Sequence, residues 1–224
     1  MTEKRAAVED QGLVRVAALA LMLVPVLQIL AMAHHPSLHA HDASQVVSQL
    51  RTTAPLSALV HGVLIAFMYV ILLAFTEFSV RRGLSQPAVR AALILYGAGV
   101  IFMTAAALVS GFIVSRLGFV IPGAVPTDDT LIVKLVTFAS LFNQAFAHCA
   151  AVLRSAGIAA WSLELLRGSG AARVLGGYGL LSAIGCALAL IFGVLQLDVH
   201  GMTVVVLLQS AWTIGVGVLL LRGA

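Results

Sequence analysis

The chain has 224 residues, of which 61% are hydrophobic and only 10% are charged, and its mean hydropathy is +1.06. One soluble core cannot bury this much apolar surface, so the composition excludes a soluble globular protein and indicates a polytopic membrane protein. The net charge of +4 does not indicate a nucleic-acid partner, because the Lys and Arg residues stand singly between apolar segments and form no basic patch.

Six apolar segments are long enough to cross roughly 30 Å of hydrocarbon as helices, at about 1.5 Å per residue. They take up most of the chain and leave no room for a soluble domain. We therefore expect an all-α polytopic membrane bundle of six transmembrane helices, forming a single integral membrane domain over residues 1–224. The segments are 12–33, 55–79, 88–114, 142–166, 174–196 and 201–221.

The basic residues distinguish the two sides of this bundle. Nine of the thirteen Lys and Arg residues flank the spans on one side, and the positive-inside bias makes that side cytoplasmic. We expect residues 1–11 to be a cytoplasmic tail, both termini to be cytoplasmic, and the membrane to be the bacterial inner membrane, with bilayer lipid as a partner. The nine residues are Lys4, Arg5, Arg15, Arg81, Arg82, Arg90, Arg167, Arg173 and Arg222.

Two long connections lie on the outer side in this topology. Residues 34–54 form a histidine-rich outer loop, and residues 115–141 form an outer loop with a short helix. The second half of the latter, TDDTLIVKLVTFASL, starts with Thr and Asp residues typical of helix N-caps. We interpret it as an outer-surface helix that leads into the fourth span. The alternative is a fourth span from about 130 to about 154, which would leave Trp161 in water.

The span 12–33 allows a second interpretation. Its basic start, its apolar run and Ala31-Met32-Ala33 together resemble a signal peptide with an A-x-A cleavage site. Cleavage would make His34 the new N-terminus, whose amine and ring can together chelate copper. Against this interpretation, the apolar run is longer than a usual signal core, and Glu9 and Asp10 lie in the leader.

The seven histidines all fall toward the outer side. The stretch HHPSLHAHD, residues 34–42, contains four of them. His61 and His148 each lie about 9 to 11 Å below the expected start of their own helix, at matching depth, and His200 lies in the last outer hairpin. Imidazole with carboxylate is the ligand set of Zn, Cu, Ni or non-haem Fe. The stretch 34–42 contributes His34, His35, His39, His41 and Asp42.

These positions predict a transition-metal site, with copper or zinc favoured because nitrogen ligands dominate. His61, His148 and His200 would be the core ligands, and the stretch 34–42 would be a capture arm for metal handling or for metal-dependent chemistry at the membrane surface. A simpler interpretation is also open. Either intramembrane histidine alone is explained by a helix-to-helix hydrogen bond, and loop histidines are often solvated and inert.

Two further functions fit the same residues. His61 and His148 could be the axial ligands of a b-type haem that exchanges electrons with quinone. The chain could instead be a non-catalytic binding or structural subunit whose cavity holds lipid or a helix of a partner membrane subunit. The common nucleotide, serine-hydrolase and zincin motifs do not occur in a fitting context.

Arg154 is the charged residue expected deepest in the membrane, about eleven residues into the fourth span. A guanidinium there costs several kcal/mol unless it is paired. Glu77 and Glu164 are the intramembrane carboxylates that could form a structural ion pair with it. The functional alternative is that Arg154 binds the anionic head of a ligand or a haem propionate.

The layout of the chain resembles a group of small bacterial six-helix integral membrane proteins with no assigned activity. The residues that carry the resemblance are FNQAFAHCAAVLRSAGIAAWSLELLRGSGAARVLGGYG, 142–179, with the polar loop after the first span and the outer helix before the fourth. The resemblance covers most of the chain and implies the fold, but it implies no substrate and no catalytic residue. The stretch HHPSLHAHD departs from that group.

Overall fold

The structure is a computed structural model that describes residues 2–34, 42–119, 129–197 and 199–223. These residues form helices and short connections, and none of them lies in a strand. The helices are α1 (Thr2–Ala33), α2 (Ala43–Arg82), α3 (Pro87–Leu108), the π-helix η1 (Val109–Val114), α4 (Ser115–Leu117), α5 (Asp129–Leu166), α6 (Gly170–Ile191) and α7 (Val199–Leu221).

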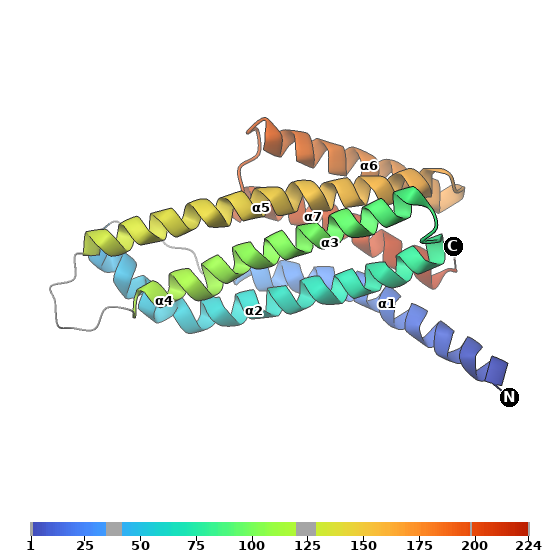
Figure 1. Ribbon diagram of the computed structural model, residues 1–224, viewed down its shortest axis with the longest axis horizontal. Helices are drawn as coiled ribbons and strands as arrows, with labels where there is room; N and C mark the ends of the chain where they lie inside the picture. Colours follow the sequence, from blue (N-terminus) through green and yellow to red (C-terminus); the bar gives the residue numbers. More distant parts are fainter. Residues whose placement is uncertain (1, 35–41, 120–128, 198, 224) are drawn as a thin grey trace.

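Six helical segments within the described residues are long and apolar enough to cross a membrane, which confirms the predicted all-α, multi-pass bundle. The N-terminal and C-terminal ends of the described chain lie at the same end of the bundle, beside the α2–α3 and α5–α6 connections (Figure 1). We call this end the basic end and the other the opposite end. The basic end carries Arg82, Arg90, Arg167, Arg173 and Arg222.

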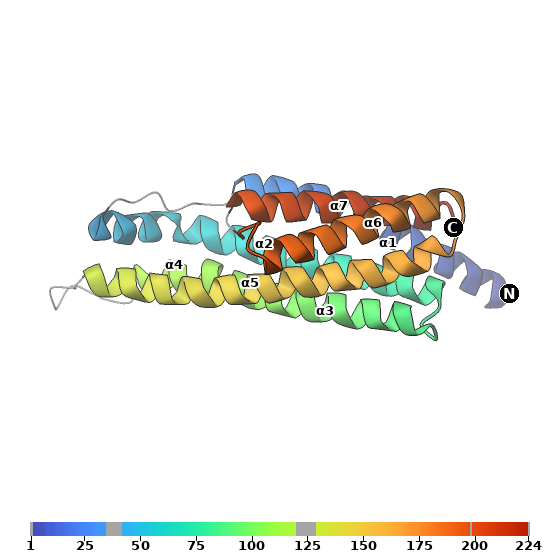
Figure 2. The ribbon, with the colours of Figure 1, turned by 90° about the horizontal axis from the view of Figure 1, so that it is seen from above.

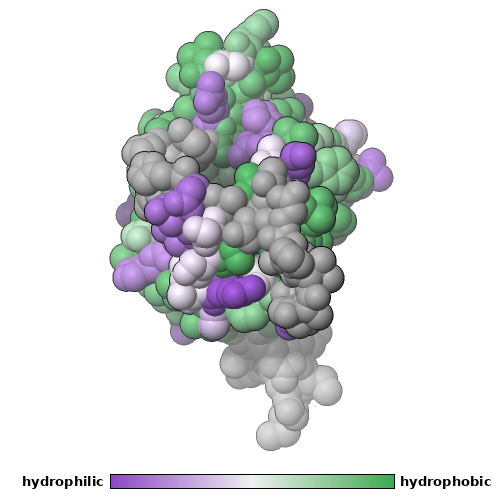
Figure 3. Space-filling view, turned by 90° about the vertical axis from the view of Figure 1, so that its left-hand side faces the viewer, coloured by the Kyte–Doolittle hydropathy of each residue, from purple (hydrophilic) through white to green (hydrophobic). Residues whose placement is uncertain are grey.

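Three segments continue at the opposite end beyond α1, α6 and α7 (Figures 1 and 2). This helical extension consists of the first turns of α2 and α5 together with η1 and α4. Val47 and Leu50 of α2 pack there against Ile132 of α5 in a small buried core. Figure 3 looks onto the opposite end and shows hydrophilic side chains gathered among hydrophobic ones. The exposed polar residues on α2 there include Ser44, Gln45 and Ser48.

The extension corrects two expected boundaries. Residues 43–54 are the first turns of α2, so the predicted outer loop over 34–54 is shorter than expected. The predicted outer-surface helix before the fourth span is not separate, because α5 is continuous from Asp129 to Leu166. The same continuity rejects a fourth span that ends near 154. Trp161 is fully buried among other aromatic side chains of the bundle.

The helix α1 is part of the bundle core. Ala18 and Leu21 are fully buried, and the backbone of α1 meets α7 at Gly217. Removing residues 1–33 as a leader would expose the facing surfaces of α2 and α7, which disfavours the signal-peptide interpretation.

An aromatic cluster fills the bundle toward the basic end. It consists of Phe75, Phe78, Tyr96, Trp161 and Trp212, which come from α2, α3, α5 and α7. The rings of Phe75 and Trp161 stack with centroids 4.6 Å apart, and Tyr96 meets Phe75 edge-on at 4.8 Å. The indole N–H of Trp161 donates to Ser79 Oγ at 3.0 Å, so its polar atom is satisfied.

A close helix contact that bears on function joins α3 and α5 through two glycines. A Cβ on Gly99 would lie 2.6 Å from Cγ of Arg154. A Cβ on Gly157 would lie 2.9 Å from the carbonyl oxygen of Ala92 and from Cβ of Tyr96. Because glycine has no side chain at these two positions, α3 and α5 pack closely together, and this packing sets Arg154 beside Tyr96.

We predict that Gly157→Ala destabilises the bundle by about 1 to 3 kcal/mol, because its methyl group would collide with rigid backbone of α3. Thermal unfolding of the purified protein in detergent should show a lower melting temperature. Gly185→Ala is the matched control, since a Cβ on Gly185 meets nothing within 4 Å. Equal melting temperatures for the two variants would contradict the close α3–α5 contact.

Candidate functional site

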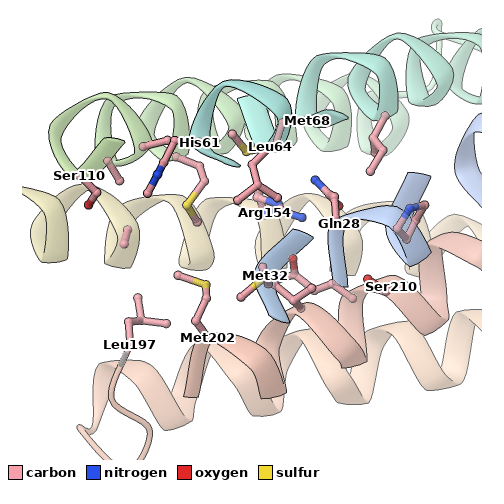
Figure 4. Close-up of a pocket in the computed structure, with 18 of the residues that line it drawn as sticks. Gln28, Met32, His61, Leu64, Met68, Ser110, Arg154, Leu197, Met202 and Ser210 are labelled. Carbon is pink, nitrogen blue, oxygen red and sulfur yellow. The ribbon is translucent and has the colours of Figure 1, made fainter. Parts of the chain in front are cut away.

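A cavity of about 300 Å³ lies at the centre of the bundle, between α1, α2, α3, α5 and α7 (Figure 4). Most of its lining is apolar, and methionines contribute much of it. Amide, imidazole, hydroxyl and guanidinium groups supply the polar part. None of the described residues that line it is acidic. The polar members used below are Gln28, His61, Tyr96, Arg154 and Gln209.

Arg154 is the only described residue lining the cavity whose side chain carries a permanent charge. Its Nη2 donates a long hydrogen bond of 3.4 Å to the hydroxyl of Tyr96, and its Cζ lies 5.3 Å from the centre of the Tyr96 ring. The buried Nε of Arg154 has no hydrogen-bond partner among the described residues. A cation–π contact and one long hydrogen bond therefore leave both donor capacity and charge available.

The predicted ion pair of Arg154 with Glu77 or Glu164 is wrong. Glu77 Oε1 lies 2.9 Å from Nε of Arg81, and Glu164 Oε2 lies 2.8 Å from Nη1 of Arg167. Each carboxylate is paired with a residue three or four positions later in the chain, Arg81 on the same helix and Arg167 just after the end of α5, a spacing that brings side chains together on one helix face. The aromatic cluster, through Trp161, also lies between Arg154 and Glu164 along α5.

His61 lies in the cavity wall with only 5% of its surface exposed. Its Nδ1 lies 2.8 Å from the carbonyl oxygen of Ser57, which can only accept, so Nδ1 carries a proton. The facing residue is Gly111 of η1, where a Cβ would lie 2.4 Å from that of His61. Short π-helical segments are frequent at functional sites, which singles out this contact.

His148 does not join His61. It is absent from the described cavity lining, and its Nδ1 bonds the Gln144 carbonyl oxygen of its own helix at 3.0 Å. Gly111 of η1 faces His61, whereas Gly99 of α3 faces Ala150 and Arg154. The α3 residue level with His148 is therefore near position 103, about 12 Å along the axis from Gly111.

The predicted matching depth of His61 and His148 is therefore wrong. It assumed that the starts of the two helices lie at one level, whereas the contacts of Gly111 with His61 and of Gly99 with Ala150 and Arg154 set the two histidines about eight residues apart along the neighbouring helix. Within the residues that the structure describes, no group of three or more His, Cys, Asp or Glu side chains could hold a metal ion. The His200 side chain lies outside the described ones, so its part in a metal site stays a prediction.

The capture arm is only partly described. His34 is exposed at the end of α1, with Nδ1 2.9 Å from the carbonyl oxygen of Leu30. Asp42 is the N-cap of α2, since its carboxylate accepts from the backbone N–H of Gln45 at 2.8 Å and from the Ser44 hydroxyl. The predicted ligands His35, His39 and His41 lie outside the described residues.

Several cavity residues were not identified from the sequence. Gln28 is buried, with 8% of its surface exposed. It could have been identified from the sequence, because it is a polar residue inside an apolar span. Tyr96 and the methionines carry no such signal, because both residue types are ordinary in membrane helices. Only the packing of the helices shows that they share one cavity with Arg154.

Comparison of the chain with protein-family models, curated proteins and solved structures finds no match. The resemblance to a bacterial six-helix group therefore stays a prediction. The class of protein is defined by the structure itself, as a multi-pass membrane bundle with a cationic central cavity.

We predict that acidification loosens the start of α2. Hydrogen bonds from the Gln45 N–H and the Ser44 hydroxyl hold the pKa of Asp42 below its ordinary value of 3.8. Its stabilising effect is therefore fully present above pH 3.8 and is lost as the pH falls through the lower pKa of the folded protein. Amide hydrogen exchange at Gln45, corrected for intrinsic rates, should rise over that lower range. Asp42→Asn keeps a capping side chain without the titration, so its corrected exchange should not change there, and a matching rise would contradict the prediction.

Proposed function

We propose that this protein is an inner-membrane binding protein that takes an amphipathic anion into the central cavity, with the acidic head of the ligand on Arg154. The observation that carries the proposal is the half-buried guanidinium whose Nε has no partner and which has no described acidic neighbour. This combines two interpretations of the sequence, the binding subunit whose cavity holds lipid and the binding of an anionic head by Arg154.

Charge supports the choice of an anion. A guanidinium stays protonated in proteins, and in surroundings of low dielectric an unpaired charge costs several kcal/mol. A bound carboxylate or phosphate would supply the missing counter-charge. It would also accept parallel hydrogen bonds from Nε and a terminal nitrogen, the arrangement in which Arg recognises these groups best.

The rest of the cavity suits an apolar tail. Leu64, Ile71 and four methionines line it, and a methionine side chain adapts to ligands of different shape. A volume of about 300 Å³ is at the lower end of the range for small-molecule sites, which favours a medium-length chain. Gln28 and Gln209 add amide groups to the polar part of the lining.

The direction of access follows from the two ends of the bundle. The positive-inside bias places the basic end in the cytoplasm, with both termini there. The aromatic cluster fills the bundle on that side of Arg154. Leu197 and Asn143 line the cavity toward the opposite end. The ligand would therefore enter from the periplasmic side or from the bilayer.

The metal and haem hypotheses have less support. A copper or zinc site on His61, His148 and His200 needs His61 and His148 to meet, and the described helices hold these two residues at different depths. A b-type haem with His61 and His148 as axial ligands would also need these two rings at one depth. The proposed electron exchange with quinone requires that haem, so it has no separate support. The capture arm at residues 34–42 remains a separate hypothesis.

We predict that dodecanoate binds the purified protein and that Arg154→Gln weakens binding by about tenfold or more. Hydrogen bonds to a charged group contribute about 1.5 to 3 kcal/mol, and about 1.4 kcal/mol corresponds to tenfold. Titration calorimetry in a non-ionic detergent measures the affinity. Arg154→Lys should keep part of it, because the charge remains without the planar fork.

Two controls sharpen this test. Arg173→Gln removes the same charge at the basic end, where Arg173 Nε bonds the Gly168 carbonyl oxygen, and it should leave the affinity unchanged. Dodecyl phosphate in place of dodecanoate distinguishes a phosphate head from a carboxylate head, and dodecanol removes the charge from the ligand. Equal binding of dodecanol and both anions, or equal binding by Arg154→Gln, would contradict the proposal.

A further inference from the structure

We propose that thioethers of the central cavity form a copper(I) site, made by Met68, Met103 and Met202 with Met32 about one turn away. The site is distinct from Arg154 and goes beyond the proposed binding of an anion. It also differs from the histidine site predicted from the sequence, because its ligands are sulfur atoms on four helices.

The first observation is the distribution of methionines. The chain has six, and four of them line this one cavity. They come from four different helices, α1, α2, α3 and α7. Figure 4 shows Met32, Met68 and Met202 turned toward the cavity.

The second observation is depth across α2 and α3. Gly97 faces Leu72, and Gly111 faces His61, so the α2 residues level with Met103 are about 67 and 68. Met68 and Met103 therefore lie at about the same depth. Both belong to the lining of the cavity.

The same comparison brings in α7. Gly99 faces Ala150 and Arg154, which places Met103 level with about residue 148 of α5. Gln144 bonds the Leu197 carbonyl oxygen, and Gln209 bonds Ser155 Oγ. A residue of α5 therefore lies level with the residue 53 or 54 positions later in the chain. Residue 148 is thus level with Met202, and Met202 lies at the depth of Met103.

Met32 lies close to this level. Gly217 of α7 packs against Ala18, Leu21 and Met22 of α1, and the two helices run in opposite directions. Counting from that contact sets Met32 level with about residue 205, roughly one turn from Met202.

Ligand chemistry selects the metal. Thioether sulfur is a soft donor that binds copper(I) in preference to hard cations. Zinc, calcium and magnesium sites use carboxylate, thiolate or several imidazole ligands, and the described lining has no acidic residue and no cysteine. Three thioethers at one depth in an apolar cavity match copper(I) among the common biological metals.

Arg154 lies about 9 Å deeper than the level of Met202, six residues further along α5. Its positive charge opposes a cation in the cavity. Arg154→Gln should therefore keep copper(I) affinity or increase it, although the same change should weaken binding of dodecanoate. The two proposals thus fail independently of each other.

The test is a competition for copper(I) with a chromophoric chelator, under anaerobic reducing conditions, on the detergent-purified full chain. To remove binding by the capture arm, His34, His35, His39 and His41 are replaced by Ala in every sample. We expect one copper(I) per chain, and at least tenfold weaker binding in the double variant Met103→Leu, Met202→Leu. Replacing Met by Leu nearly conserves the side-chain volume, so the double variant should still fold.

Met22→Leu is the matched control, since Met22 packs against Gly217 and is not among the residues lining the cavity. Its copper(I) affinity should equal that of the parent. X-ray absorption of the parent protein loaded with copper(I) should show sulfur neighbours, a readout that does not depend on any cavity variant. Unchanged affinity in the double variant, or copper with only nitrogen and oxygen neighbours, would overturn the proposal.

Discussion

The central constraint on this protein is a guanidinium held inside an apolar bundle with no acidic partner among the residues that the structure describes. Arg154 is brought there by the contact of α3 with α5, which Gly99 and Gly157 permit, and it rests on the ring of Tyr96. Its Nε has no partner, and no described residue of the cavity lining is acidic. A fold that keeps such a charge loses stability unless something else compensates it, and buried charged groups in membrane spans usually mark function.

The rest of the bundle is organised around that charge. On one side, five aromatic rings fill the space between Arg154 and the basic end. On the other side, methionines and then His61 line the cavity toward the helical extension. The cavity thus changes along its length from a cationic floor to soft sulfur donors and then to imidazole. These layers suit two kinds of ligand, an anion at the floor whose tail lies among the methionines or a soft cation bound by the methionines, and the two would compete for that space.

The sequence was sufficient for the six spans, since hydropathy over about 20 residues is a strong and local signal. It was insufficient for the starts of α2 and α5, because Val47, Leu50 and Ile132 extend both helices through contacts far apart in the sequence. Arg154 stood out as a charge in an apolar run, yet its partner was mistaken because Arg81 and Arg167 already hold the two carboxylates locally. The error over His61 and His148 arose because the relative depth of two helices depends on their contacts with a third helix, here through Gly99 and Gly111, which hydropathy does not show. The depth of Met68, Met103 and Met202 depends on register between helices, which glycine contacts determine and hydropathy does not.

The most direct test of the central claim is a crystal structure of the protein with a terminally brominated fatty acid. The anomalous signal of bromine locates the tail, and the electron density locates the head. Our account predicts the carboxylate within hydrogen-bond distance of Nε and a terminal nitrogen of Arg154, with the bromine among the methionines. A head outside the cavity, with Arg154 still unpaired or bound to another side chain, would contradict it.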